Sequence, residues 1–198
     1  MRNIVLPASA LGFIDSLDSK KHSLLVYSEP SFAKKIEYLF VKNGLLKGEY
    51  CIVLTHDKTK FIEREMLEHN IDVKKYEENG ILHIYQISDP TEHNLSILDG
   101  FKELTKIILS DSKPPYRVVG RMMYDVKTNG GISIACHFEN LFHSSMFENF
   151  DGSVLCTYDL DDIKSNDRWQ QWLTKLKNCH DASIIQTKDG KVVVNFQG

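Results

Sequence analysis

Residues 22–55 read HSLLVYSEPSFAKKIEYLFVKNGLLKGEYCIVLT. The stretch opens and closes on short apolar runs, HSLLVY and YCIVLT, which are typical of strands buried on both faces of a sheet. Between them, apolar side chains recur at the spacing of one helix face, at Phe32, Ile36, Leu39 and Phe40. A strand, a helix and a second strand in this order predict a crossover between two parallel strands.

The same alternation continues to the end of the chain. We expect Gly44 to end the first helix, because a residue without a Cβ accepts the left-handed backbone found at helix C-termini. Asp57 or Thr59 is expected to cap a second helix over residues 57–70. The remaining elements are predicted as strands at 81–87, 116–120 and 153–158, helices at 94–110, 132–150 and 167–178, and a terminal hairpin at 182–187 and 191–196. The pattern predicts an α/β fold in which a mainly parallel sheet carries helices on both faces and a C-terminal β-hairpin at its edge.

Composition narrows the class of protein. The 198 residues carry 24 Lys and Arg against 27 Asp and Glu, which gives a formal net charge of −3. This charge argues against a nucleic-acid partner, since nucleic acids are bound largely through their phosphates. No apolar run approaches the roughly 18–20 residues that span a bilayer, and the N-terminus is too broken for a signal peptide. We therefore expect a cytoplasmic protein without a nucleic-acid or membrane partner. Residues 1–20 are expected to be an N-terminal extension, and residues 21–198 a single domain.

The four cysteines are widely spaced, at Cys51, Cys136, Cys156 and Cys179. Cys51 and Cys156 lie inside apolar runs and are interpreted as small buried hydrophobic residues. Cys136 and Cys179 are each followed by a histidine, but neighbouring side chains point in different directions, so neither pair chelates well by itself. The sequence therefore predicts no disulfide, no metal and no cofactor.

The turn after the first strand, residues 27–35, is where a phosphate-binding loop would lie. It contains no glycine, Glu29 would set a negative charge against the phosphates, and Pro30 lacks a backbone N–H. Lys34 or Lys35 alone does not restore the motif. We interpret the turn as a degenerate P-loop and expect a protein that does not hydrolyse nucleotides and is not an enzyme.

Arg121 follows Gly120 at the end of the fourth predicted strand. Ligands of open parallel sheets bind beyond the carboxyl ends of the strands, so Arg121 is placed to pair with an anionic group. A salt bridge to Glu139 or Asp159 is an equal alternative. Residues 122–124, Met-Met-Tyr, offer adaptable apolar contacts to a small organic ligand or simply pack in the core.

Glu139 lies in the apolar stretch 136–147, where a buried carboxylate needs a partner. Its candidate partners are Arg121, His22 and Tyr158. Asp159 follows the fifth strand and is expected to cap the next helix, with catalysis as the weaker alternative. Together with Asp161 and Asp162 it could attract a divalent cation, but the spacing fits no loop motif.

Several short phrases, in this order along residues 21–163, resemble the MEDS family, the sensory domain of methanogens and methylotrophs found in the regulator DcmR. They are His22 with Tyr27, then Gly44, Leu45, Gly48 and Glu49, then residues 70–73, Glu139, and the strand end Leu155, Cys156, Tyr158 and Asp159. The resemblance implies a three-layer fold like that of the RecA and KaiC ATPases, without the P-loop lysine. It also implies a domain that senses small hydrocarbon derivatives. Arg121 stands where many members of the family carry an acidic residue, which reverses the charge at the expected pocket mouth.

We therefore expect a stand-alone sensor that binds a small organic ligand and signals through a protein partner or a second copy of itself. The expected ligand-binding residues are His22, Tyr27, Glu29, Arg121, Tyr124, Glu139, Tyr158 and Asp159. One alternative is an ATPase-like protein-interaction module that uses the surface near Trp169 and Trp172. Others are a weak nucleotide binder, and an enzyme that uses His22, Glu139 or Asp159.

Overall fold

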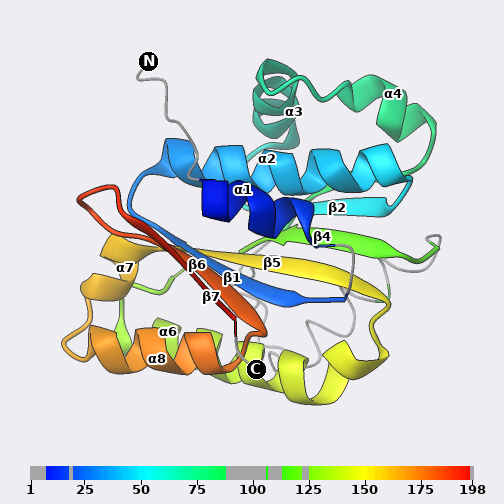
Figure 1. Cartoon of the computed structure of the whole chain (residues 1–198). Helices are drawn as coiled ribbons and strands as arrows, with labels where there is room; N and C mark the ends of the chain where they lie inside the picture. Colours follow the sequence, from blue (N-terminus) through cyan, green and yellow to red (C-terminus); the bar gives the residue numbers. More distant parts are fainter. Residues whose placement is uncertain (1–7, 18–19, 88–105, 107–112, 122–124, 197–198) are drawn as a thin grey trace.

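The computed structural model describes residues 8–17, 20–87, 106, 113–121 and 125–196. A seven-stranded sheet runs through its centre in the order β3-β2-β4-β5-β1-β6-β7 (Figure 1). The strands are β1 His22–Tyr27, β2 Tyr50–Thr55, β3 Leu82–Gln86, β4 Tyr116–Gly120, β5 Gly152–Asp159, β6 Ala182–Gln186 and β7 Val192–Phe196. All neighbouring pairs are parallel except the antiparallel pair β6 and β7, so the expected α/β fold with a hairpin at the edge is confirmed.

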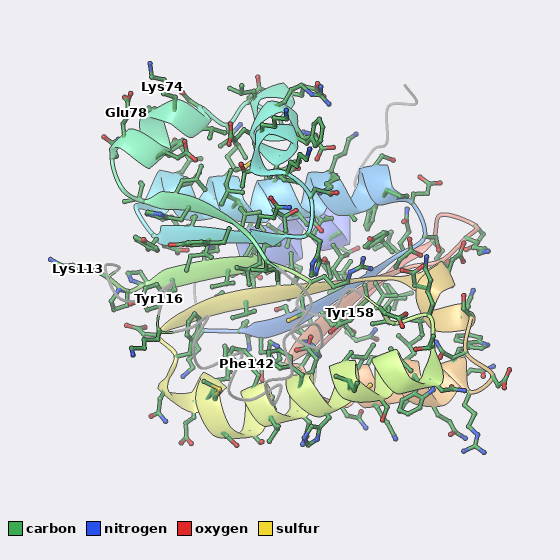
Figure 2. All side chains as sticks on the ribbon, turned by 180° about the vertical axis from the view of Figure 1, so that it is seen from behind. Lys74, Glu78, Lys113, Tyr116, Phe142 and Tyr158 are labelled. Atoms are coloured by element: carbon green, nitrogen blue, oxygen red, sulfur yellow. The ribbon has the colours of Figure 1, made fainter. Side chains whose placement is uncertain are left out.

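Helices cover both faces of the sheet (Figure 1). One face carries α1 Ala8–Asp15, α2 Pro30–Lys47, α3 Thr59–Glu68 and α4 Val73–Glu78. The other carries α6 Asn129–Leu141, the π-helical turn η2 Phe142–Met146, the 3₁₀ turn η3 Phe147–Asn149, α7 Leu160–Lys164 and α8 Trp169–Asn178. Phe142 projects on this α6 side of the sheet (Figure 2). No helix among the described residues is long and apolar enough to cross a membrane.

Each face of the sheet has its own hydrophobic core, because successive side chains of a strand point to opposite sides. Leu25 of β1 and Leu155 of β5 pack under α1 and α2. Leu24 and Cys156, their neighbours along the chain, pack with the α6 side instead. Side chains on the two faces of one strand therefore reach different sites.

Several helix boundaries differ from the sequence prediction. Gly44 does not end α2; the helix continues to Lys47, and Gly48, with φ 77°, takes the left-handed C-terminal position. Neither Asp57 nor Thr59 caps α3, since Lys58 precedes it without a side-chain cap bond. Three short helices, α1, α4 and α7, were not predicted.

The predicted helix 132–150 begins earlier, at Asn129, because the hydroxyl of Thr128 accepts a hydrogen bond from the N–H of Gly131 and caps the first turn. It also changes its hydrogen-bonding pattern at Phe142, where the π-helical turn begins. The helix predicted at 94–110 lies outside the described residues, apart from residue 106.

Arg117, in the middle of the fold, explains why α2 contains a glycine. Its side chain is 1% exposed and forms a two-pronged salt bridge with Glu49, in which the distance from Nη2 to Oε1 is 3.0 Å. The guanidinium also donates to the carbonyl oxygens of Leu17 (2.9 Å) and Phe40 (3.2 Å) and lies over the Phe40 ring. One side chain thus joins β4, α2, the start of β2 and the segment that follows α1.

A methyl group at Gly44 would collide with this arrangement. An added Cβ would lie 2.5 Å from Cδ of Arg117 and 2.8 Å from Sγ of Cys51. We expect Gly44→Ala to lower the free energy of unfolding by about 1–3 kcal/mol, even though alanine is otherwise the better helix former. Urea unfolding followed by circular dichroism measures the change.

Gly12→Ala in α1 is the matched control, because an added Cβ there meets no other atom within 4 Å. This variant is expected to be neutral or slightly more stable than the wild type. Equal stability of Gly44→Ala and Gly12→Ala would contradict the packing argument.

Candidate functional site

A pocket of about 330 Å³ lies at the carboxyl ends of β1, β2 and β4, on the α2 side of the sheet. Tyr27, Thr55 and Gly120 line it from the strand ends, together with Arg121 just beyond β4. Side chains of α2 form the opposite wall, among them Tyr38. This is where ligands of open parallel sheets generally bind.

The walls of the pocket carry both positively and negatively charged side chains. Lys34 lies 3.6 Å from carboxylate oxygens of Glu37 and of Glu65, and Glu65 also accepts a hydrogen bond of 2.6 Å from the hydroxyl of Tyr38. Arg121 pairs with Asp162, with 3.4 Å between Nη1 and Oδ2. Its walls therefore suit a ligand with polar groups.

Neighbouring groups fix the ring orientation of His56 and the protonation of Tyr27, which both line the pocket. The His56 ring lies between the carbonyl oxygens of Ile87 (3.1 Å) and Arg121 (3.0 Å), which fixes the ring plane. Burial raises the pKa of Tyr27 to about 12, against the opposing charge of Arg121. The phenol of Tyr27 is therefore neutral and can donate a hydrogen bond at physiological pH.

The turn between β1 and α2 is short, and its backbone donors are already used. Gln186 Oε1 accepts hydrogen bonds from the N–H groups of Ser28 (3.3 Å) and Glu29 (3.0 Å). Pro30, the first helical residue, has no N–H. A phosphate-binding loop needs several free N–H groups at this position. Here the side chain of Gln186 occupies two of them.

A second group of polar side chains is buried on the other face of the sheet. We call His22, Glu139, Cys156 and His180 the buried polar cluster; they come from β1, α6, β5 and the segment between α8 and β6. All four residues are less than a tenth exposed. One ligand-type atom from each lies within 4.8 Å of the others.

Hydrogen bonds orient the members of the cluster. Tyr158 donates from its hydroxyl to Oε1 of Glu139, which leaves Oε2 facing the cluster. His180 donates from Nδ1 to the carbonyl oxygen of Leu176 at 2.6 Å, so its Nε2 carries the lone pair. Nε2 of His180 is buried and has no hydrogen-bond partner among the described residues.

Burial and the neighbouring charges set the protonation of the cluster. Burial by itself would raise the pKa of Glu139, but the hydrogen bonds from His22 and Tyr158 hold it low, at about 2. Burial lowers the pKa of His180 to about 3, so this imidazole is neutral. The pKa of the Cys156 thiol is raised, first by burial and then by the charge of Glu139.

The predicted site residues do not form one site, because some line the pocket and others lie at the buried polar cluster. Tyr27 and Arg121 line the pocket, whereas His22, Glu139 and Tyr158 lie together on the opposite face of the sheet. Of the expected partners of Glu139, His22 and Tyr158 contact it. Arg121 pairs with Asp162 rather than with Glu139 or Asp159.

The remaining candidates have other positions. Glu29 lies at the start of α2, and the carboxylate of Asp159 accepts from the N–H of Asp161 (2.7 Å), so its predicted role as a helix cap is confirmed. Tyr124 lies outside the described residues. The acidic residues after β5 do not converge, because Asp161 pairs with Lys188 while Asp162 pairs with Arg121 and Lys127. Trp169 and Trp172 are partly buried against the core.

Sequence reasoning missed His180 as a partner of His22, and it missed Tyr38 and His56 as pocket residues. His180 is distant in the sequence from the other members of the cluster, so no local motif marks it. A signal did exist for Tyr38 and His56, since His56 directly follows a strand and Tyr38 lies one residue from the apolar face of α2.

Comparisons with known proteins agree with the fold. The family model for the methanogen/methylotroph, DcmR sensory domain, MEDS, matches residues 21–174. The chain is similar to the crystal structure of a KaiC-like protein from the hyperthermophilic archaeon Pyrococcus horikoshii, with a TM-score of 0.59 and 14% identity over 90% of this chain and 80% of that chain. It is also similar to a second solved structure, an ATPase domain, with a TM-score of 0.53 and 11% identity over 86% of this chain and 71% of that chain. At these identities the likenesses show the fold alone. No curated protein matches.

Proposed function

Because the chain belongs to the MEDS family of sensory domains, we propose that it senses a small organic molecule in the pocket at the carboxyl ends of β1, β2 and β4, without hydrolysing nucleotide. The observation that carries the proposal is the use of the Ser28 and Glu29 N–H groups by Gln186. Two of the N–H groups that a phosphate-binding loop would use in this turn already bond a side chain of the protein itself. The pocket lined by Tyr27, Pro30 and Lys34 adjoins this turn and offers room for a different ligand.

The dimensions and walls of the pocket favour a small polar ligand. A volume of about 330 Å³ is at the lower end of the range for small-molecule sites. The neutral phenol of Tyr27, the guanidinium of Arg121 and the ammonium of Lys34 are donors, which suits a ligand with acceptor oxygens or an anionic group. Ligand contacts at Tyr27 lie next to the turn that Gln186 holds, so binding there would reach the β6–β7 hairpin and, through it, a protein partner or a second copy.

The test is a thermal-shift screen of the purified protein against one- and two-carbon compounds. Formate, acetate and methanol are the probes with acceptor oxygens, and methylamine and dichloromethane are the probes without them. At least one probe is expected to raise the melting temperature, and its affinity is expected to fall about tenfold or more in Arg121→Ala, the cost of losing one charged hydrogen bond. Lys127→Ala is the matched control, because Lys127 also pairs with Asp162, at 3.7 Å, but does not line the pocket.

Two results would count against the proposal. One is a probe affinity that falls equally in Arg121→Ala and Lys127→Ala, which would place the binding outside the pocket. The other is tight retention of ATP with magnesium together with release of inorganic phosphate, which would show that the protein hydrolyses ATP.

A further inference from the structure

The buried polar cluster has the dimensions of a metal site. In tetrahedral zinc sites the bonds to nitrogen, oxygen and sulfur are about 2.0–2.3 Å, which places neighbouring ligand atoms about 3.3–3.6 Å apart. Oε2 of Glu139 lies 3.3 Å from Nε2 of His22, 3.4 Å from Sγ of Cys156 and 3.6 Å from Nε2 of His180. Nε2 of His22 lies 3.4 Å from the same sulfur. These four distances match edges of such a tetrahedron, and the other two, from His180 to His22 and to Cys156, are within 4.8 Å.

One ring nitrogen of His180 has no hydrogen-bond partner among the described residues. Its Nδ1–H is committed to the carbonyl oxygen of Leu176, which leaves Nε2, 3.6 Å from Oε2 of Glu139, as the nitrogen on the side of the cluster. A buried ring nitrogen without a hydrogen-bond partner among the described residues is costly unless something binds it.

The outer contacts are also those of ligands held in place for a metal. The second nitrogen of His180 bonds a backbone carbonyl, and the second oxygen of Glu139 accepts from Tyr158. Nδ1 of His22 lies 3.4 Å from Nδ1 of His143. Metal-binding histidines and carboxylates nearly always have such partners, which fix their orientation.

We propose that His22, Glu139, Cys156 and His180 bind a Zn²⁺ ion in a closed, four-coordinate structural site. Two neutral imidazoles, one carboxylate and one thiolate cancel the charge of the ion, so the loaded site is neutral inside the protein. Four protein ligands leave no open position for water or substrate, which excludes a catalytic zinc of the usual kind. The ion would join β1, β5, α6 and the segment between α8 and β6. The site is separate from the pocket, because Cys156 and Thr157 point to opposite faces of the sheet.

The test uses the full chain, stripped with a chelator and titrated with Zn²⁺ or Co²⁺. We expect one ion per chain, and with Co²⁺ the intense visible bands of a tetrahedral site together with a near-ultraviolet thiolate-to-cobalt charge-transfer band. Cys156→Ser is expected to abolish the charge-transfer band. Cys136→Ser is the matched control, since Cys136 is buried on α6 outside the cluster, and it should keep the band.

Affinities provide an independent readout. His180→Gln is expected to weaken zinc binding by more than about 100-fold, and Tyr158→Phe, which removes an outer contact, by about 10–100-fold. Should Cys156→Ser fail to fold, X-ray absorption of the zinc-loaded wild type decides the question, with one sulfur at about 2.3 Å and three lighter ligands at about 2.0–2.2 Å. A shell without sulfur, a cobalt spectrum without the charge-transfer band, or no stoichiometric binding would overturn the site. None of these outcomes depends on whether the pocket binds a ligand.

Discussion

Glu49→Ala is expected to lower the free energy of unfolding by about 3–5 kcal/mol, because it leaves the guanidinium of Arg117 buried without its counter-ion. Arg117 is 1% exposed, and the hydrogen bonds to the carbonyl oxygens of Leu17 and Phe40 do not neutralise its charge. Folded domains are stable by only about 5–15 kcal/mol, so the loss is a large part of the total. Urea unfolding followed by circular dichroism measures it.

Two comparisons separate this effect from the loss of an ordinary surface charge. Glu78 pairs with Lys74 at 3.8 Å on α4, where both side chains project away from the sheet (Figure 2). Glu78→Ala is expected to change stability by less than about 0.5 kcal/mol. The double variant Glu49→Ala, Arg117→Met removes the buried charge and should recover part of the loss. A double variant no more stable than Glu49→Ala would show that the unpaired charge is not the cause.

The Arg117 arrangement also shows where sequence reasoning stops. The strand around Arg117 and the glycines near residue 44 were both visible in the sequence, and the phrase Gly44 to Glu49 carried part of the resemblance to the MEDS family, which is confirmed. A glycine near a helix end predicts a C-terminal cap, and Gly48 does serve as one. Gly44 serves the close approach of a side chain from a distant part of the sequence, for which no local pattern exists.

The buried polar cluster could be predicted in part. Parallel strands pair β1 with β5 so that Leu24 lies opposite Cys156 and His22 opposite Val154, and His22 and Cys156 then share one face. Both strands are readable from their apolar runs, but their adjacency is not, because it depends on the strand order of the whole sheet. Once that order is known, alternation alone places His22, Cys156 and Tyr158 together. His180 follows α8 and required the three-dimensional structure.

The pocket was predicted in position but not in composition. Strand ends are easy to read when buried runs are short and bounded by polar residues, and Tyr27 and Arg121 follow from that rule. The opposite wall comes from α2, whose rotation about its axis is set by packing. Periodicity identified the buried face of α2 at Phe32 and Ile36 but not that Tyr38, beside this face, would reach the pocket.

Gly120→Ala is expected to lower the free energy of unfolding by about 2–4 kcal/mol, through both strain and collision. Gly120 has a φ of 151°, which side-chain-bearing residues rarely adopt, and an added Cβ would lie 2.3 Å from the carbonyl oxygen of Leu54. Leu54 is its partner across the β2–β4 pair in the middle of the sheet. The backbone oxygen cannot rotate away as a flexible side chain can, so the two strands must separate.

The glycine at this strand end thus admits the close approach of the neighbouring strand. Gly130→Ala is the control, since an added Cβ in the first turn of α6 meets no atom closer than Oγ1 of Thr128 at 4.0 Å. That variant should match or slightly exceed the wild type in stability. Because Gly120 also lines the pocket, the strain argument requires that the loss be seen in urea without any ligand present. A loss confined to probe binding, with unchanged unfolding, would instead assign Gly120 to ligand recognition.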